Sequence, residues 1–98
     1  MSSGTRVYAV YIVTNRRHGT LYVGMTGDLK VRIYQHREGV VDGFSRRYAM
    51  KQLVWYELHA TAEAVIIREK RIKSWKREWK IQLIEEMNSE RADLFTRL

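Results

Sequence analysis

The chain begins with two strand-like stretches that are close enough in sequence to form a hairpin. Arg6–Thr14 and Thr20–Thr26 are rich in β-branched and aromatic residues, which favour pleated strands. The residues between them, Asn15–Gly19, are polar and suited to a turn. Because Arg6–Thr14 is apolar on both of its faces, we expect it to be a strand that other layers cover on both sides.

Two tyrosines belong to this hairpin, one on each strand. If the loop centres on Arg16–Arg17, Tyr11 lies directly opposite Tyr22, with cross-strand Cβ atoms ~5 Å apart. A bulge at Gly19 would move this register by one residue. Strand tyrosines usually pack in a core, but two facing phenols can also place both hydroxyls on one phosphate or water.

A short helix is predicted directly after the hairpin. Gly27 breaks the strand, Asp28 can cap the first turn, and Gly39 can end the helix. Four residues at positions i, i+3, i+4 and i+7 share one helix face: Leu29, Arg32, Ile33 and His36. A guanidinium and an imidazole therefore point the same way as the apolar side chains. They are either a surface pair at the edge of the core or the lining of a functional cleft.

The second half of the chain predicts one more strand and a long helix. Lys51–His59 has strand composition, and Thr61–Lys80 has helical periodicity with Thr61 as its cap. Ile81–Asn88 continues or restarts that helix. Three residues recur every seven positions and mark its inward stripe: Val65, Ile72 and Trp79. We therefore expect Trp79 in the core and the whole chain, 1–98, to form one domain.

Charge separates this chain from an ordinary soluble domain. The 98 residues carry a formal charge of +7, with a pI near 10.0, which favours polyanionic partners such as nucleic acid. The chain has no cysteine, which excludes disulfides and thiolate metal sites. No segment approaches the ~20 apolar residues of a membrane span, and no secretory signal is visible, so we expect no membrane partner and a cytoplasmic location.

The positive charge is concentrated in the predicted long helix. Arg68–Lys80 contains seven basic residues and two acidic ones, which favours contact with a nucleic-acid backbone over a merely solvated face. The predicted contact residues on this helix are Lys70, Lys73, Arg77 and Lys80. Arg46 and Arg47, in the glycine-containing loop Gly39–Met50, would extend the same surface.

One carboxylate lies in the inward stripe of that helix. Glu69 follows Val65 by four residues, and a carboxylate buried there without a partner costs several kcal/mol. It is therefore paired, with Arg68 or Arg32 as the expected partner, or exposed in a cleft, or bound to a cation. A hard ion such as Mg²⁺ is often held by one or two carboxylates together with water and substrate phosphate.

The order of these parts resembles the GIY-YIG nuclease superfamily. Ala9-Val10-Tyr11 stands where the family has Gly-Ile-Tyr, and Tyr22-Val23-Gly24 stands where it has Tyr-Ile-Gly. The stretch "DLKVRIYQH" is similar to the helix that carries the family arginine, here Arg32. The stretch from Glu63 to Asn88 is similar to the glutamate-bearing helix of the small single-domain bacterial (UPF0213-like) members.

This resemblance implies a fold and a chemistry. The fold would be α+β, a three-stranded antiparallel sheet flanked by helices. The activity would be that of a DNA endonuclease that depends on a divalent metal ion, Mg²⁺ or Mn²⁺. Its substrate could be single-stranded or branched DNA, and its pathway could be repair or recombination. Tyr11 and Tyr22 would orient or deprotonate the attacking water, and His36 would assist proton transfer. Arg32 would bind the scissile phosphate, and Glu69 would hold the metal ion.

Two departures from the family pattern keep other functions open. Met25 stands where some members carry lysine, and Ile81 stands where several carry asparagine. A catalytically degenerate nucleic-acid-binding module is therefore the alternative to a nuclease. A third hypothesis is an interaction or dimerisation domain that uses the aromatic strand Leu53–Leu58 or the exposed part of the tryptophan-bearing helix.

Overall fold

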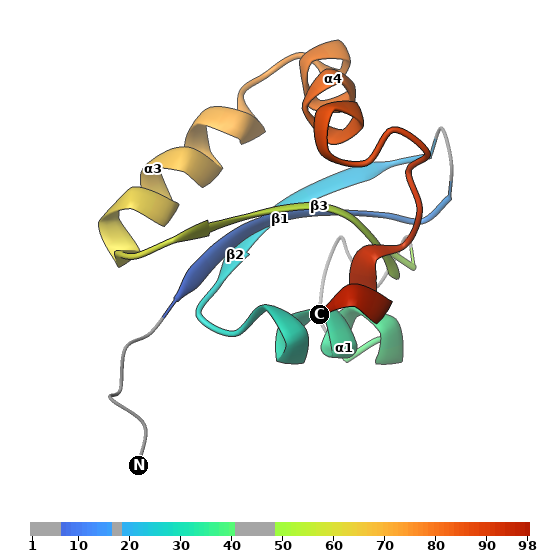
Figure 1. The fold of residues 1–98 in the computed structure, drawn as a ribbon, viewed down its shortest axis with the longest axis horizontal. Helices are drawn as coiled ribbons and strands as arrows, with labels where there is room; N and C mark the ends of the chain where they lie inside the picture. The colour runs from blue at the N-terminus through green and yellow to red at the C-terminus, as the bar shows by residue number, and fades with distance from the viewer. Residues whose placement is uncertain (1–6, 17–18, 41–48) are drawn as a thin grey trace.

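A three-stranded antiparallel sheet forms the middle layer of the molecule (Figure 1). The computed structural model describes residues 7–16, 19–40 and 49–98. Their elements are β1 (Tyr8–Thr14), β2 (Leu21–Thr26), α1 (Leu29–Glu38), β3 (Gln52–His59), α3 (Ala62–Lys73), α4 (Arg77–Met87) and the 3₁₀ helix η1 (Leu94–Arg97). The strand order is β2-β1-β3, so the first strand of the hairpin is the central one. The predicted α+β class and three-stranded sheet are confirmed.

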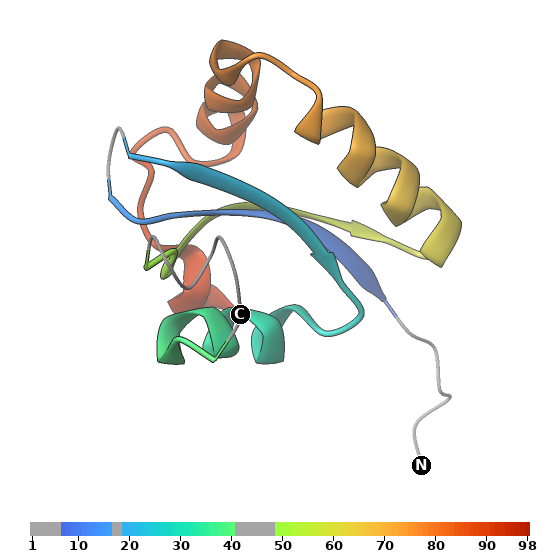
Figure 2. The ribbon, with the colours of Figure 1, turned by 180° about the vertical axis from the view of Figure 1, so that it is seen from behind.

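Helices cover both faces of this sheet. Figures 1 and 2 show α3 and α4 over one face and α1 with η1 over the other. The first core contains Val10, Ile12, Val23, Val54, Trp55, Val65, Ile72 and Ile84. The second contains Tyr11, Val13, Ile33, Met50, Leu53 and Leu94. Residues Ala9–Thr14 of β1 are all buried, as the apolar composition of that strand on both faces predicts.

The register of the hairpin differs from the predicted one by two residues. Tyr11 pairs with Gly24, and Tyr22 pairs with Val13, so the prediction that the two tyrosines lie directly opposite was wrong. Side chains close the loop: Thr14 Oγ1 donates to the Thr20 carbonyl at 2.9 Å, and the strands end at the pair Thr14–Leu21. Because the shift is an even number of residues, both tyrosines stay on the same face of the sheet.

The helix α1 begins and ends where the sequence predicts. The side chain of Asp28 accepts a hydrogen bond from Val31 N, and Gly39 ends the helix in the left-handed region at φ +73°. Ile33 and His36 are buried against the sheet, as the spacing of that helix face requires. A buried imidazole thus forms part of the layer below β1.

The predicted helix Thr61–Lys80 is two helices, so that prediction was wrong in its second half. The Ser74 hydroxyl donates to the Arg71 carbonyl at 2.7 Å, and Lys76 is extended at φ −60° and ψ 155°. Such a serine bond competes with the helical ladder and ends α3. After this break the seven-residue phase is lost. Trp79 is 50% exposed, which contradicts its predicted place in the core, and Ile84 is buried instead.

No helix in the described part of the chain combines the length and the apolar character that crossing a bilayer requires.

Candidate active site

A buried hydrogen bond joins the central strand to the helix below it. The Tyr11 hydroxyl and His36 Nε2 lie 3.0 Å apart, and both residues are about as buried as the apolar core. Their rings meet edge to face, with centroids 5.5 Å apart and an interplanar angle of 69°. Because β1 and α1 are each fixed by core packing, this pair is held in place from both sides.

The second tyrosine belongs to the same cluster. Tyr22 lies two residues along the sheet from the Tyr11–Gly24 pair, and its ring centroid is 5.7 Å from that of His36. Its side chain is partly buried at the edge strand β2. The imidazole therefore lies between two phenols, one interior and one at the edge of the sheet.

Gly24 has no side chain because the Tyr11 ring occupies that space. A Cβ atom at this position would lie 2.5 Å from both Cζ and the hydroxyl oxygen of Tyr11. Real Cβ atoms do not approach other atoms so closely, so any larger residue would displace the phenol. The hairpin pattern alone did not reveal this contact, although a glycine inside a strand is a signal of close approach.

Burial sets the charge state of the buried pair. It raises the pKa of Tyr11 well above its usual range, and the nearby Tyr22 and Glu69 add to this while Arg32 opposes it. Burial also lowers the pKa of His36 to about 4, with a further contribution from the Arg32 charge. At neutral pH both groups are therefore uncharged. In the tautomer protonated on Nδ1, His36 accepts through Nε2 the hydrogen bond that Tyr11 donates.

Arg32 lies next to this pair on α1 and is partly exposed. It lines a groove of about 260 Å³ together with Thr26, Gly27, Asp28, Val31 and Gln35. No carboxylate in the described segments forms an ion pair with it. Since its charge acts on the pKa of both Tyr11 and His36, the guanidinium lies within electrostatic reach of the buried hydrogen bond.

Glu69 approaches the cluster from the other layer. Its side chain is 11% exposed, and its Oε2 lies 2.6 Å from Nζ of Lys73, one turn later on α3. The predicted partners were wrong: Arg68 pairs with Glu57 at 2.9 Å instead. The i,i+4 spacing of Glu69 and Lys73 is readable from the sequence, so this partner is one that sequence reasoning missed.

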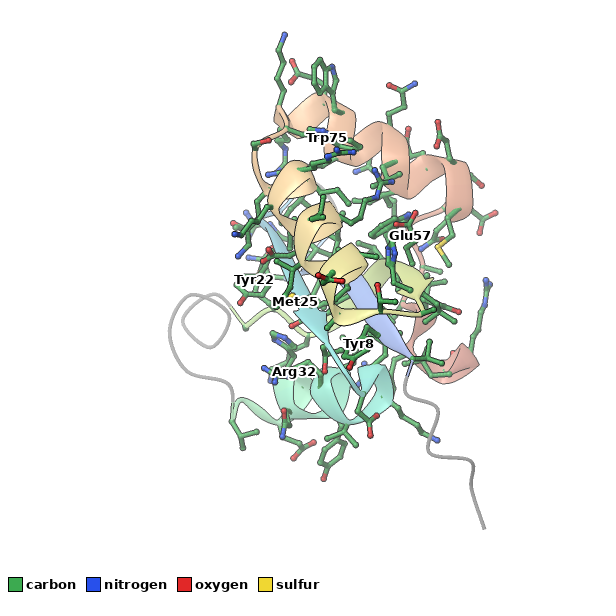
Figure 3. All side chains as sticks on the ribbon, turned by 90° about the vertical axis from the view of Figure 1, so that its left-hand side faces the viewer. Tyr8, Tyr22, Met25, Arg32, Glu57 and Trp75 are labelled. Atoms are coloured by element: carbon green, nitrogen blue, oxygen red, sulfur yellow. The ribbon has the colours of Figure 1, made fainter. Side chains whose placement is uncertain are left out.

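The charge of Glu69 acts on the buried pair across the sheet. Glu69 raises the pKa of Tyr11, so the carboxylate lies within electrostatic reach of the phenol although α3 covers the opposite face. Figure 3 looks onto the β2 edge of the sheet, with Tyr22 between α3 above and α1 below, and Arg32 on α1. The Tyr22 ring contacts the imidazole, and Arg32 and Glu69 act on the buried pair through their charges.

A metal ion at Glu69 would have one protein ligand. The described residues contain no group of three or more histidine, cysteine, aspartate or glutamate side chains that could hold an ion. A single carboxylate suits a hard ion such as Mg²⁺, which keeps several waters and takes further oxygens from substrate phosphate. Lys73, which forms the ion pair with this carboxylate, has a half-exposed side chain that can move away into solvent. The residues present therefore fit a hard divalent ion bound mainly by water and phosphate.

The predicted basic surface is interrupted. Lys73 is paired with Glu69, and Arg77 donates from Nη2 to the Gly19 carbonyl at 2.6 Å, which fastens α4 to the hairpin loop. Lys70 is exposed on α3, and Lys80 is partly exposed on α4 beyond the break. Arg46 and Arg47 lie outside the described residues.

Comparison with known proteins gives a consistent result for sequence and structure. A family model described as the GIY-YIG catalytic domain matches residues 7–82. The chain is 36% identical to a UPF0213 protein of Bacillus pumilus over 73 residues, which is 74% of each chain. It is 40% identical to a UPF0213 protein of Haloquadratum walsbyi over 67 residues, which is 68% of this chain and 75% of the relative.

A solved structure has the same fold. The UPF0213 protein of Bacillus halodurans, determined by NMR in solution, superposes with a TM-score of 0.55 at 26% sequence identity. The match covers 86% of this chain and 88% of that one.

Proposed function

Because the chain belongs to the GIY-YIG family, and within it to the UPF0213 proteins, we propose that it is a divalent-metal-dependent DNA endonuclease. The GIY-YIG domain is a nuclease domain, which indicates hydrolysis of phosphodiester bonds and DNA as the class of substrate. The observation that carries the proposal is the buried hydrogen bond between Tyr11 and His36, within electrostatic reach of Arg32 and Glu69. The proposed catalytic residues are Tyr11, Tyr22, Arg32, His36 and Glu69.

The Tyr11–His36 pair supplies a path for the proton of the attacking water. With its pKa raised by burial, the Tyr11 phenol is a poor base unless another group takes its own proton. Neutral His36 is that group: the phenolic oxygen accepts a proton from water as the phenol passes its hydrogen to Nε2. The negative charge of a bound phosphate would oppose the effects that lower the pKa of His36 and so favour this transfer. Tyr22, at the edge strand, orients the water on the open side of the cluster.

Arg32 binds the scissile phosphate. A guanidinium presents parallel donors that match two phosphate oxygens, and it stays charged at every relevant pH. The groove that it lines at the start of α1 leaves room for a phosphate next to the guanidinium. As negative charge builds on the phosphate oxygens in the transition state, these donors stabilise it.

Glu69 is the residue that would hold the metal ion. An Mg²⁺ or Mn²⁺ ion held there would supply Lewis-acid stabilisation of charge on the phosphate and the leaving oxygen. Glu69 is released for this purpose when the Lys73 ammonium moves into solvent, where half of that side chain already lies.

The exposed cations near the site bind the DNA backbone. A +7 chain gains affinity for polyphosphate by counterion release, and the lysines of α3 and α4 are exposed in whole or in part. The proposed contacts are Lys70, Lys73, Arg77 and Lys80, with Arg46 and Arg47 outside the described residues.

A cleavage panel tests the proposal. Single-stranded, double-stranded and branched DNA are incubated with the protein and Mg²⁺ or Mn²⁺, beside Glu69→Ala and Arg32→Ala. We expect metal-dependent nicking of at least one substrate by the wild type and none by the two variants. Circular dichroism establishes that the variants are folded. A wild-type protein that nicks no substrate with either ion would refute the proposal.

A degenerate nucleic-acid-binding module is the second candidate, and two positions favour it. Met25 is 40% exposed on β2, where some relatives would offer a lysine to phosphate. Ile81 lines a small cavity with Ile84 and Arg77, where several family members would offer an asparagine. Salt-dependent DNA binding without metal-stimulated hydrolysis would select this second function.

A further inference from the structure

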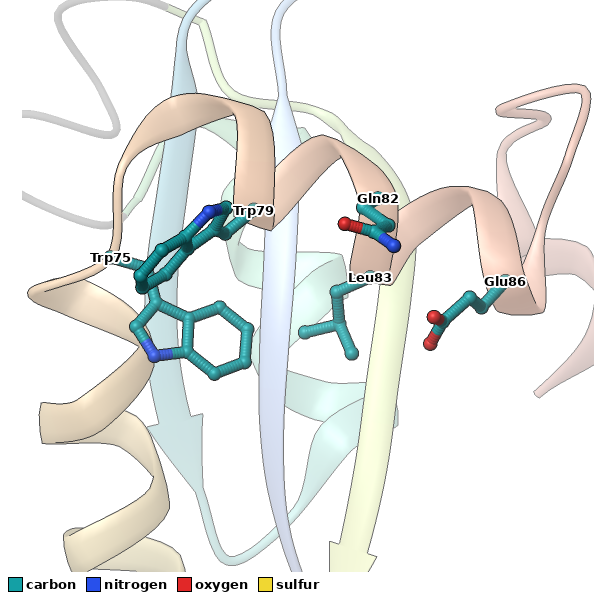
Figure 4. A pocket seen from close by; sticks show the side chains of 5 residues that line it. All are labelled: Trp75, Trp79, Gln82, Leu83 and Glu86. Atoms are coloured by element: carbon teal, nitrogen blue, oxygen red, sulfur yellow. The ribbon is translucent and has the colours of Figure 1, made fainter.

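The corner between α3 and α4 carries a groove that the proposed chemistry does not use. It has a volume of about 310 Å³ and is lined by Trp75, Trp79, Gln82, Leu83 and Glu86. This size is at the lower end of ligand pockets and suits one ring system rather than a folded element. Figure 4 shows the two indoles at one end of the α4 face and Glu86 at the other.

We infer that this groove stacks one unpaired nucleobase of a bound nucleic-acid strand. The inference rests on the proposed function, because it specifies the form of nucleic acid that the same protein holds. Stacking on aromatic side chains accepts any base, but the base must be out of its duplex to reach the ring.

The two indoles form a stacking surface, and one of them is fixed by packing against the core. Trp75 packs against the first core, and Trp79 is 50% exposed. Their ring centroids are 6.2 Å apart, with an interplanar angle of 79°. The break after Ser74 creates this arrangement, since a continuous helix would not have turned Trp79 away from the core.

Charge decides between the possible occupants. Lys76 Nζ lies 5.5 Å from the centroid of Trp79, and Arg68 Cζ lies 5.4 Å from that of Trp75. These belong to the seven basic residues between Arg68 and Lys80, which repel a cationic ligand. An acidic peptide would meet the Glu86 carboxylate inside the groove. A neutral base inside, with its phosphates outside among the lysines, satisfies both conditions.

The far end of the groove can read the edge of that base. Glu86 offers acceptor oxygens, which pair with an exocyclic amine such as N4 of cytosine, and the Gln82 amide offers both donors and acceptors. Thymine has no exocyclic amine. The groove is therefore expected to favour an amine-bearing base over thymine.

The groove also lies within reach of the candidate active site. Glu69 and Lys73 are one turn apart on α3, ~6 Å along the helix axis, and Trp75 follows two residues later. Nucleotides in a stacked strand advance by ~3.4 Å each, so a strand at Glu69 passes the groove within a few nucleotides.

Binding measured without metal tests the inference separately from cleavage. Fluorescence anisotropy follows labelled twelve-nucleotide dC and dT strands and a blunt duplex in EDTA, with Trp79→Ala beside the wild type. We expect the affinity of Trp79→Ala for the dC strand to fall about tenfold, and its affinity for the duplex to change less than twofold. Tyr34→Ala, which removes a 55% exposed ring from α1, is the matched control and should change neither affinity.

A second variant tests the edge contacts. Glu86→Ala should reduce the preference for dC over dT to near equality, whereas Glu78→Ala, an exposed carboxylate on the same helix, should leave it unchanged. Trp79→Ala that binds the dC strand as tightly as the wild type, or that loses strand and duplex equally, would overturn the inference. If the wild type stacks the strand through Trp79 but never cleaves, the proposed function fails and the stacking site stands.

Discussion

The hydroxyl of Tyr11 lies 3.0 Å from Nε2 of His36, inside the layer between the central strand and α1. Both groups are buried, and neither carries a charge at neutral pH. A phenol and an imidazole can each give and take a proton, so this hydrogen bond is suited to moving one. Its consequences for stability and for catalysis can be measured.

The free energy of unfolding should decrease as the pH is lowered through the titration range of His36. Its pKa is about 4 in the folded protein, against an ordinary value of 6.5. Between those values the unfolded chain binds a proton that the folded protein does not, so the folded state loses stability as pH falls. The full difference corresponds to about 3 kcal/mol. Urea unfolding at pH 7 and pH 4.5 should show the advantage of the wild type over His36→Gln shrinking at the lower pH. An advantage that stays constant would contradict the lowered pKa.

Gly24→Ala should displace Tyr11. The new Cβ would lie 2.5 Å from the phenolic oxygen, and overpacking of this kind costs about 1–3 kcal/mol. We expect lower unfolding free energy and a loss of cleavage activity of tenfold or more. Gly39→Ala is the matched control, because its cost comes from the backbone at φ +73° and its Cβ meets no atom within 4 Å. The free energy of unfolding of that variant should be about 1–2 kcal/mol lower, but its cleavage activity should be unchanged. Equal activity of the two variants would count against a role for the Tyr11 position.

Local sequence signals account for much of this fold. The capping residue Asp28 and the left-handed Gly39 set the limits of α1, and the strand compositions gave three strands within about two residues of their ends. The face of α1 that carries His36 followed from helical spacing alone. These features depend on contacts within one turn or one strand, so a single sequence contains them.

The features that sequence reasoning missed depend on contacts between distant residues or on competing local bonds. The hairpin register depends on how the loop side chains bond, and on the space above Gly24 that the Tyr11 ring needs. The break after α3 depends on a serine hydroxyl that bonds its own helix backbone, which a serine at an exposed position need not do. Once that break occurs, a seven-residue repeat no longer predicts where Trp79 points.

Lys73→Met should tighten metal binding. The Lys73 ammonium lies 2.6 Å from the Glu69 carboxylate, and a divalent ion must displace it. An ion pair with one exposed partner is worth about 0.2–1 kcal/mol, so removal should lower the Kd for Mn²⁺ by a factor of about 1.4 to 5. Titration calorimetry in the absence of DNA measures this directly. Lys70→Met removes the same charge from an exposed position on α3 and should have the smaller effect. Equal effects of the two variants would show that only net charge matters.

Tyr11→Phe removes the hydroxyl that bonds His36 and leaves the ring that packs in the second core. The single-turnover rate of DNA cleavage is measured for this variant and for the wild type with saturating metal ion. The comparison therefore separates proton transfer from folding and from substrate binding. If the phenol passes a proton to the imidazole, the cleavage rate should fall by about a hundredfold or more. The free energy of unfolding should fall by only about 1–3 kcal/mol, the cost of removing one partner of a buried hydrogen bond. A rate within twofold of the wild type would contradict the proposed role of the Tyr11–His36 pair.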